Sequence, residues 1–230
     1  MADDEQIARR LLSSLSKYGG PKGPTAAEAG EALHSLGTIA RNLRGSAPSK
    51  EVEAIITYVI DKRNEVPTPP LVLEGAVKGA AALGTEKAGR ALNQVVWSSV
   101  PARMVCEALK GMAEMIPRSS EDGQKQMLKS LERALLTHSS DSVRALAAEY
   151  LGRYGQKEHA SILGAMALRA PEEHVRNSAK QAFAELAKRY GISQHEARQS
   201  LAAALGSRPS RSLEQRREET LAFVERRLRE

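Results

Sequence analysis

Apolar residues recur at three- and four-residue spacing along most of the chain, which predicts amphipathic helices rather than strands. Between residues 25 and 43, for example, Leu33, Leu36, Ile39 and Ala40 would lie on one helix face. Turn-forming residues separate the successive segments, and no segment shows the strict alternation of a half-buried strand. The pattern therefore predicts an all-α protein.

Several residues indicate where individual helices begin. Thr25–Glu28 and Ser193–Glu196 both have the spacing of a capping box, in which a hydroxyl and a carboxylate satisfy the free amides of a first turn. Ser49 is the expected cap of the next helix after the one that begins at Thr25. Pro70 and Pro101 stand where a first turn tolerates a residue without an N–H group.

A helix-length pattern also repeats along the chain. When residues 125–188 are shifted by 32 positions, Asp141-Ser142-Val143-Arg144 falls on Glu173-His174-Val175-Arg176. Ala147 then falls on Ala179, and Leu151 falls on Phe183. Self-similarity at a fixed period across two helices is typical of a helical repeat array.

The repeated Asp/Glu-x-Val-Arg motif, followed by Ala and by Leu-Gly in the first copy, resembles the HEAT repeat. The resemblance is clearest over residues 125–188, and weaker copies near residues 71–84 and 103–113 lack the Val-Arg pair. It implies a right-handed α-α superhelix, a solenoid of the HEAT-like or armadillo type, with about five helix pairs after the N-terminal helices.

The resemblance also assigns structural roles to the repeated residues. It implies a polar ladder between neighbouring repeats formed by Asp141, Arg144, Glu173 and Arg176. The apolar positions of the motif would face the core at i, i+4 and i+8 spacing. These core positions are Val143, Ala147, Leu151, Val175, Ala179 and Phe183.

We expect residues 1–230 to form a single α-solenoid domain. The Gly/Pro-rich run 19–24 is the expected connector after a first helix over residues 4–17. Residues 207–230 are expected to supply a C-terminal capping helix, because terminal repeats need a polar outer surface. Gly75 and Gly79 make one helix face narrow, which favours close packing against a neighbouring helix.

Composition narrows the remaining choices. Apolar residues make up 41% of the chain and aromatic residues 3%, so the core must consist mainly of aliphatic side chains. The single cysteine, Cys106, excludes an intrachain disulfide and favours a reducing compartment. We find neither a signal peptide nor a membrane-spanning run, and we therefore expect a cytoplasmic protein.

The net charge of +6 lies mostly in the C-terminal half, where residues 116–230 hold 20 Lys or Arg and 15 Asp or Glu. This excess permits binding to nucleic acid or to acidic proteins, but it is also typical of an ordinary solvated surface.

Catalytic and metal-binding patterns are weak. The five histidines are scattered, so we expect neither a metal site nor a cofactor. HEAT-like hydroxylases hold iron with several His-Glu pairs, whereas His195-Glu196 stands alone and is explained as part of a cap. HEAT-like DNA glycosylases need an aromatic cleft, and Trp97 is the only tryptophan.

These observations favour a non-catalytic scaffold that binds a protein partner on its concave surface. The alternative is a nucleic-acid-binding protein, with a glycosylase-like role included, that uses basic residues of the C-terminal half. The candidate binding residues are Arg144, Arg176, Asn177, Lys180, Arg216 and Arg217. Positions that differ between the repeat copies, such as Ser142 and His174, are further candidates.

Overall fold

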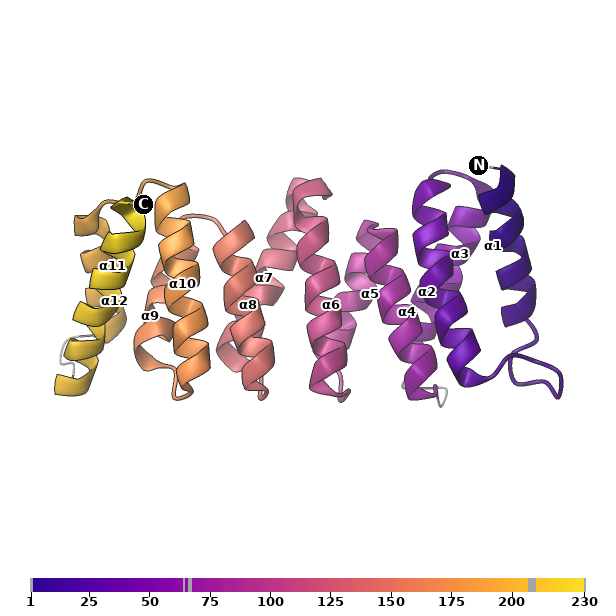
Figure 1. Cartoon of the computed structure of the whole chain (residues 1–230), viewed down its shortest axis with the longest axis horizontal. Coiled ribbons are helices and arrows are strands. Elements are labelled where there is room, and N and C mark those ends of the chain that lie inside the picture. The colour runs from indigo at the N-terminus through magenta and orange to yellow at the C-terminus, as the bar shows by residue number, and fades with distance from the viewer. Residues whose placement is uncertain (1, 64, 66–67, 207–209, 230) are drawn as a thin grey trace. The chain divides into compact units, whose positions relative to one another are not determined.

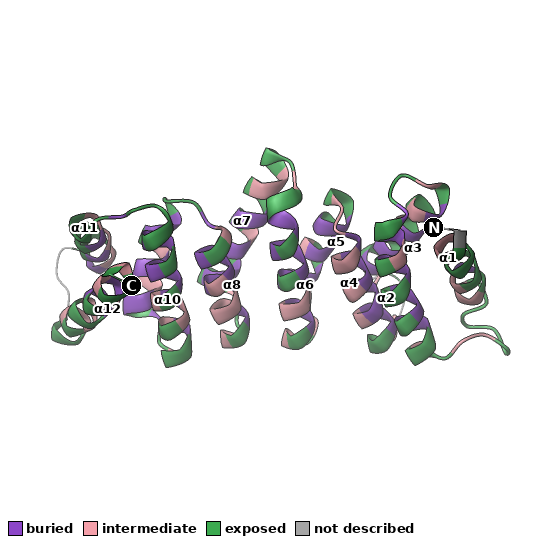
Figure 2. Ribbon diagram, turned by 45° about the horizontal axis from the view of Figure 1, so that its top comes forward, coloured by how far each residue is buried: buried purple, intermediate pink, exposed green. Residues whose placement is uncertain are grey.

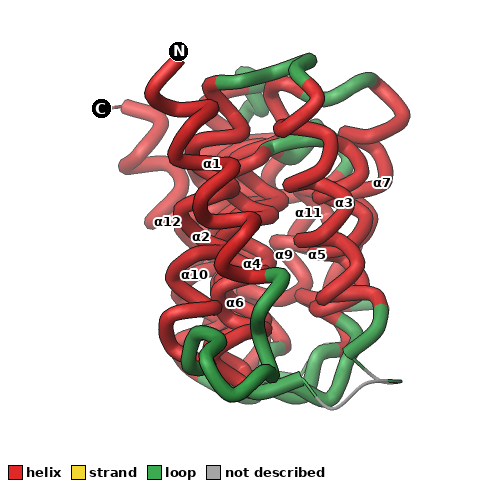
Figure 3. The backbone as a smooth tube through the Cα atoms, turned by 90° about the vertical axis from the view of Figure 1, so that its right-hand side faces the viewer, coloured by secondary structure: helices red, strands yellow, loops and turns green. Residues whose placement is uncertain are grey.

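A computed structural model describes residues 2–63, 65, 68–206 and 210–229 of the chain. The regular secondary structure of these residues is entirely helical, which confirms the all-α prediction. Short loops join the helices (Figure 1, Figure 3). The helices run in the order α1 Ala2–Leu15, α2 Ala26–Asn42, α3 Ala47–Asp61, α4 Pro70–Leu83, α5 Glu86–Val96, α6 Ala102–Met115, α7 Glu121–Thr137, α8 Asp141–Tyr154, α9 His159–Arg169, α10 Glu173–Arg189, α11 Gln194–Leu205 and α12 Arg211–Arg229.

The chain divides into two compact units, Met1–Met127 and Leu128–Glu230, and the boundary lies inside α7. In the first unit α2, α4 and α6 lie side by side, and α3 and α5 form a second layer behind them (Figure 1). Helix α1 packs on α2 and α3. That residues 1–230 form one domain stays a prediction.

The second unit has the same two-layer arrangement. Helices α8, α10 and α12 form one layer, and α9 and α11 form the other (Figure 1). We call α2, α4 and α6 the second-helix layer of the first unit, and α8, α10 and α12 that of the second unit. This packing of neighbouring helix pairs confirms the α-solenoid class.

Local cap chemistry accounts for several helix starts. The two capping boxes form as expected: Glu28 accepts a hydrogen bond from the Thr25 amide at 2.8 Å, and Glu196 accepts one from the Ser193 amide at 2.8 Å. The prediction that Ser49 caps α3 is wrong, because Ser46 is the cap and accepts a hydrogen bond from the Ser49 amide at 3.3 Å. Pro48 fits the first turn, which lets the helix begin three residues earlier.

The two ends of the chain agree in part with the expected boundaries. Helix α1 ends at Leu15, and the Gly/Pro run 19–24 lies in a connector of turns and bends over residues 16–23 and irregular backbone at residues 24–25. Helix α12 packs on α9, α10 and α11, while residues 207–209 and 230 of the expected cap lie outside the described residues. The capping role of this helix stays a prediction.

Glycine allows α2 and α4 to approach until their backbones touch. A Cβ atom on Gly75 would lie 2.0 Å from the Gly30 carbonyl oxygen, and one on Gly37 would lie 2.2 Å from the Gly79 carbonyl oxygen. The prediction that Gly75 and Gly79 serve close helix packing is therefore confirmed, and α2 is the neighbouring helix. In the second unit Gly152 plays a similar part, because its Cβ would lie 2.7 Å from Ala182.

The core consists mainly of small and aliphatic residues on the inner helix faces (Figure 2). The six repeat positions expected to face the core are all fully buried, namely Val143, Ala147, Leu151, Val175, Ala179 and Phe183. The core assignment that follows from the resemblance is therefore confirmed.

Substitution of Gly75 by Ala tests the close approach of α2 and α4. The added methyl group would meet the backbone of Gly30, which cannot rotate away, so we expect a loss of about 1–3 kcal/mol in the free energy of unfolding. Urea denaturation monitored by circular dichroism measures this loss.

Gly89→Ala is the matched control in α5. Its new methyl group would meet two flexible methionine side chains, with the Met115 sulfur at 3.4 Å and the Met127 sulfur at 3.9 Å, and Ala has the higher helix propensity. We expect this variant to be as stable as the wild type or slightly more stable. Equal urea midpoints for the two variants would contradict a destabilising clash between residue 75 and the Gly30 backbone.

Candidate functional site

Arg144 lies on α8 at the junction between two successive repeats. Its guanidinium forms ion pairs with Asp141 at 2.8 Å and with Glu172 at 2.5 Å. Because Glu172 is the N-cap of α10, the second ion pair joins neighbouring second helices. Hydrogen bonding to Glu172 raises the pKa of Arg144, and only 14% of this side chain remains exposed. The geometry gives Arg144 a structural role.

The acidic residue that reaches back to Arg144 is Glu172, whereas the repeat motif pointed to Glu173. The backbone of Glu172 is extended and precedes the helix, while Glu173 is the first helical residue and is exposed. Arg176, the equivalent arginine of the next repeat, donates hydrogen bonds to the carbonyl oxygens of Ala170 at 2.8 Å and Pro171 at 2.6 Å. Arg176 therefore holds the loop that precedes α10.

Two arginines of α12 also have partners within the chain. Arg216 donates a hydrogen bond to the Leu168 carbonyl oxygen at the end of α9, at 3.1 Å. Arg217 forms ion pairs with Glu214 and Glu218, the latter at 2.8 Å. Hydrogen bonding to Glu218 raises the pKa of Arg217. The Arg216 contact ties α12 to α9, whereas the Arg217 pairs lie within α12 and balance part of the charge of that helix.

Asn177 and Lys180 lie on α10, within one turn of each other. Asn177 is exposed. Lys180 is half-buried, and its ammonium group lies 5.1 Å from the centre of the Phe223 ring on α12. The Arg227 guanidinium lies 5.8 Å from the same ring. Both distances are within the range of cation–π attraction.

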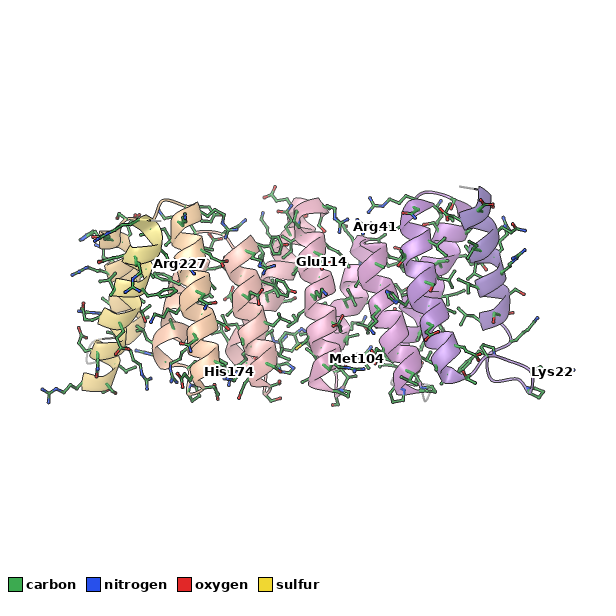
Figure 4. All side chains as sticks on the ribbon, viewed as in Figure 1. Lys22, Arg41, Met104, Glu114, His174 and Arg227 are labelled. Carbon is green, nitrogen blue, oxygen red and sulfur yellow. The ribbon has the colours of Figure 1, made fainter. Side chains whose placement is uncertain are left out.

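A cavity of about 220 Å³ opens between α10 and α12 beside Phe223. We call it the α10–α12 groove. Figure 4 labels Arg227 at this place in the second-helix layer. The groove is lined by Gln181, Ala184, Glu185, Lys188, Phe223 and Arg227.

Sequence reasoning located this region only in part. Lys180 was a candidate residue, and Glu185 is a position at which the repeat copies differ, since Arg153 stands there in the first copy. Lys188, Phe223 and Arg227 were not candidates. The signal that could have found them is Phe223 itself, one of only two phenylalanines, placed among the arginines of a highly charged helix.

A cavity of similar size, about 210 Å³, lies between α2 and α4 in the second-helix layer of the first unit. Leu71 lines it and is 52% exposed. Glu74, in the same wall, forms an ion pair with Lys78 at 2.8 Å and a second one with Arg103 on α6. The hydrogen bond from Lys78 is the main cause that lowers the pKa of Glu74.

Residues considered for catalysis have ordinary surroundings. Trp97 is half-buried where α5 ends, and its indole N–H donates a hydrogen bond to Asn93 at 3.2 Å. Cys106 is half-buried on α6 rather than fully in the core.

Across the residues that the structure describes, His, Cys, Asp and Glu side chains do not gather in the groups of three that a metal site needs. In the same residues, every helix is too short or too polar to cross a membrane.

Comparison with known proteins adds one finding. The family model for HEAT repeats matches residues 102–184 and again residues 128–222. No curated protein matches the chain.

Arg144→Ala tests whether this arginine is structural. The substitution leaves Glu172, which is 27% exposed, and Asp141 without their shared cation, so we expect a loss of about 1–2 kcal/mol in the free energy of unfolding. Arg217→Ala is the control, since Arg217 is 28% exposed and its two partners lie on its own helix, and exposed pairs contribute about 1 kcal/mol or less. Urea denaturation compares the two variants. A stability of Arg144→Ala equal to that of the wild type would contradict the structural role.

Glu196 links the N-termini of α9 and α11. Its carboxylate accepts hydrogen bonds from the Ser193 amide and hydroxyl group, and it forms an ion pair with Lys157 at 2.9 Å. The Ser193 amide is the largest cause that lowers the pKa of Glu196, from 4.5 to about 2.

A carboxylate whose pKa is lower in the folded protein stabilises it fully above the unfolded-state pKa. We therefore expect this stabilisation to be present above pH 4.5 and to be lost as the pH falls toward about 2. Melting temperatures of the wild type and of Glu196→Gln, measured by circular dichroism between pH 6 and pH 3, test this. The two curves should converge on acidification, and parallel curves would contradict the assignment.

Proposed function

Because the chain belongs to the HEAT-repeat family, we propose that it is a non-catalytic scaffold that binds a protein partner on the exposed face of its second-helix layers. HEAT repeats commonly serve as protein-interaction scaffolds. The grooves between α10 and α12 and between α2 and α4 support this proposal, because each offers charged and apolar groups side by side. Such mixed lining suits a polypeptide partner.

The observation that carries the proposal is that the candidate arginines already have partners within the chain. Arg144, Arg176 and Arg216 are held by ion pairs or by backbone carbonyl groups of the same chain, and Arg217 is paired with two glutamates. A nucleic-acid-binding surface derives its affinity from cations that can neutralise phosphates. These four arginines are instead engaged by carboxylates or carbonyl groups of the same chain.

The surface of the first unit also favours a protein partner. Its α2–α4 groove presents Glu31 and Glu74 beside Lys78 and the exposed Leu71. A groove with both signs of charge and an exposed leucine is poorly suited to a polyphosphate backbone. The nucleic-acid alternative therefore has less support than the protein scaffold.

The absence of a catalytic role and a cytoplasmic location are part of the same proposal. The hydrogen bond from the Trp97 indole to Asn93, one turn earlier in the chain, accounts for this residue without a reaction. A single cysteine and no disulfide suit a reducing compartment.

Site-specific photocrosslinking tests the proposal. Asn177, exposed on α10, is replaced by benzoylphenylalanine in the full chain, and cells that express the variant are irradiated. We expect a discrete protein adduct at this position.

Ser161 provides the matched control, because it is exposed on α9 in the other layer of the same unit. The same adduct at both positions would contradict binding through the second-helix layer. Duplex DNA or RNA that binds the purified chain, with an affinity that falls steeply with the logarithm of salt concentration, would support the nucleic-acid alternative instead.

A further inference from the structure

The α10–α12 groove combines an aromatic floor with a cationic rim. Phe223 and the buried Ala184 form its apolar part. Lys188 and Arg227 stand at its walls, and Lys180 approaches the Phe223 ring from α10. This arrangement exists because α12 lies against α10, so two helices that are distant in the sequence share one site.

Positive charge exceeds negative charge at the groove. Glu185 is the carboxylate among the groove-lining residues, whereas Lys188 and Arg227 line the groove and Lys180 adjoins it. The surroundings therefore attract an anionic group, while the phenylalanine ring and Ala184 attract an apolar one.

The size of the groove indicates the kind of occupant. Its volume of about 220 Å³ is below the range of about 300–1,000 Å³ that is usual for small-molecule pockets. A groove of this size accommodates one or two side chains of a partner. Protein interfaces concentrate their binding energy at such points, where an anchoring side chain enters a pocket on the partner.

We propose that the α10–α12 groove binds an acidic segment of a protein partner. A large apolar side chain of that segment would pack on Phe223 and Ala184, and flanking carboxylates would pair with Lys188 and Arg227. This inference rests on the proposed scaffold function and specifies the chemistry of the partner at this site.

A polypeptide fits the groove better than a nucleic acid does. Nucleic-acid affinity depends on neutralising many phosphates along a surface. Of the cations nearby, Arg176 holds the loop before α10, and Arg189 donates hydrogen bonds to the carbonyl oxygens of Gly152 at 2.7 Å and Gly155 at 3.0 Å. The cationic part of the groove is therefore small, which suits a few carboxylates better than a row of phosphates.

Selection from a random 12-residue peptide library on the immobilised full chain tests the proposal without knowledge of the natural partner. We expect the selected peptides to share a large apolar residue flanked by Asp or Glu. Their affinities for the purified full chain are then measured by fluorescence anisotropy with labelled copies.

Lys188→Glu is the principal variant, because Lys188 is exposed and its reversal should not disturb the fold. We expect it to weaken the selected peptides by about tenfold or more, as for a central interface contact. Phe223→Ala should weaken them to a similar extent, with circular dichroism as the check on folding. Lys129→Glu is the control, since it makes the same charge change at an exposed lysine on α7, and it should leave the affinity unchanged.

Several results would overturn the proposal. Selected peptides without acidic enrichment would do so, as would equal effects of Lys188→Glu and Lys129→Glu. A 20-nucleotide single-stranded DNA that competes for the groove and loses its binding in Lys188→Glu would assign the site to nucleic acid. Self-association of the wild type that Lys188→Glu abolishes, seen by light scattering after size-exclusion chromatography, would assign it to a second copy of the chain.

The outcome is distinguishable from failure of the scaffold function itself. A layer-specific crosslink at Asn177 that is unaffected by Lys188→Glu would retain the scaffold and reject the groove as its acidic-peptide site. If the chain with an unchanged groove gave neither the crosslink nor peptide binding, the scaffold function and the acidic-peptide site would both be rejected.

Discussion

The close approach of neighbouring second helices is the constraint on which the packing within each unit depends. Between α2 and α4 the backbones touch at Gly30 and Gly75 and again at Gly37 and Gly79. Between α8 and α10 the contact of Gly152 with Ala182 has a similar effect. A helix side without side chains lets the neighbour come close, and dispersion contacts along both backbones then replace those of larger residues.

This close approach leaves little room for polar groups at the helix crossings, so polar contacts between repeats lie toward the helix ends. Arg144 reaches Glu172 at the start of α10, Arg103 reaches Glu74 on α4, and Lys157 reaches Glu196. Each pair joins one repeat to the next, and the partial exposure of these groups keeps the desolvation cost low. The charged residues therefore align the repeats, while the small residues determine how closely they stack.

The junction between α10 and α12 has a large aromatic residue where the junction between α2 and α4 has glycines. Phe223 faces α10 with a large side chain that remains half-buried, and a cavity of about 220 Å³ remains between the helices. A cavity of similar size, about 210 Å³, opens between α2 and α4 although glycines bring those two backbones into contact, so both kinds of junction leave a groove at the surface.

Much of the fold follows from the sequence alone. Periodic apolar residues, the capping boxes at Thr25 and Ser193, and the repeated Val-Arg motif predicted the helices and the buried positions from Val143 to Phe183, because helix formation and capping depend on residues three or four apart. Only the tertiary structure decided that Glu172 and not Glu173 reaches Arg144, and that Lys180, Lys188, Phe223 and Arg227 meet at one groove. The physical reason is that the direction of a side chain at the start of a helix depends on the backbone angles of its own residue, and Glu172 is extended whereas Glu173 is helical. Contacts between α10 and α12 likewise depend on how helices separated by a whole repeat pack, which no local pattern encodes.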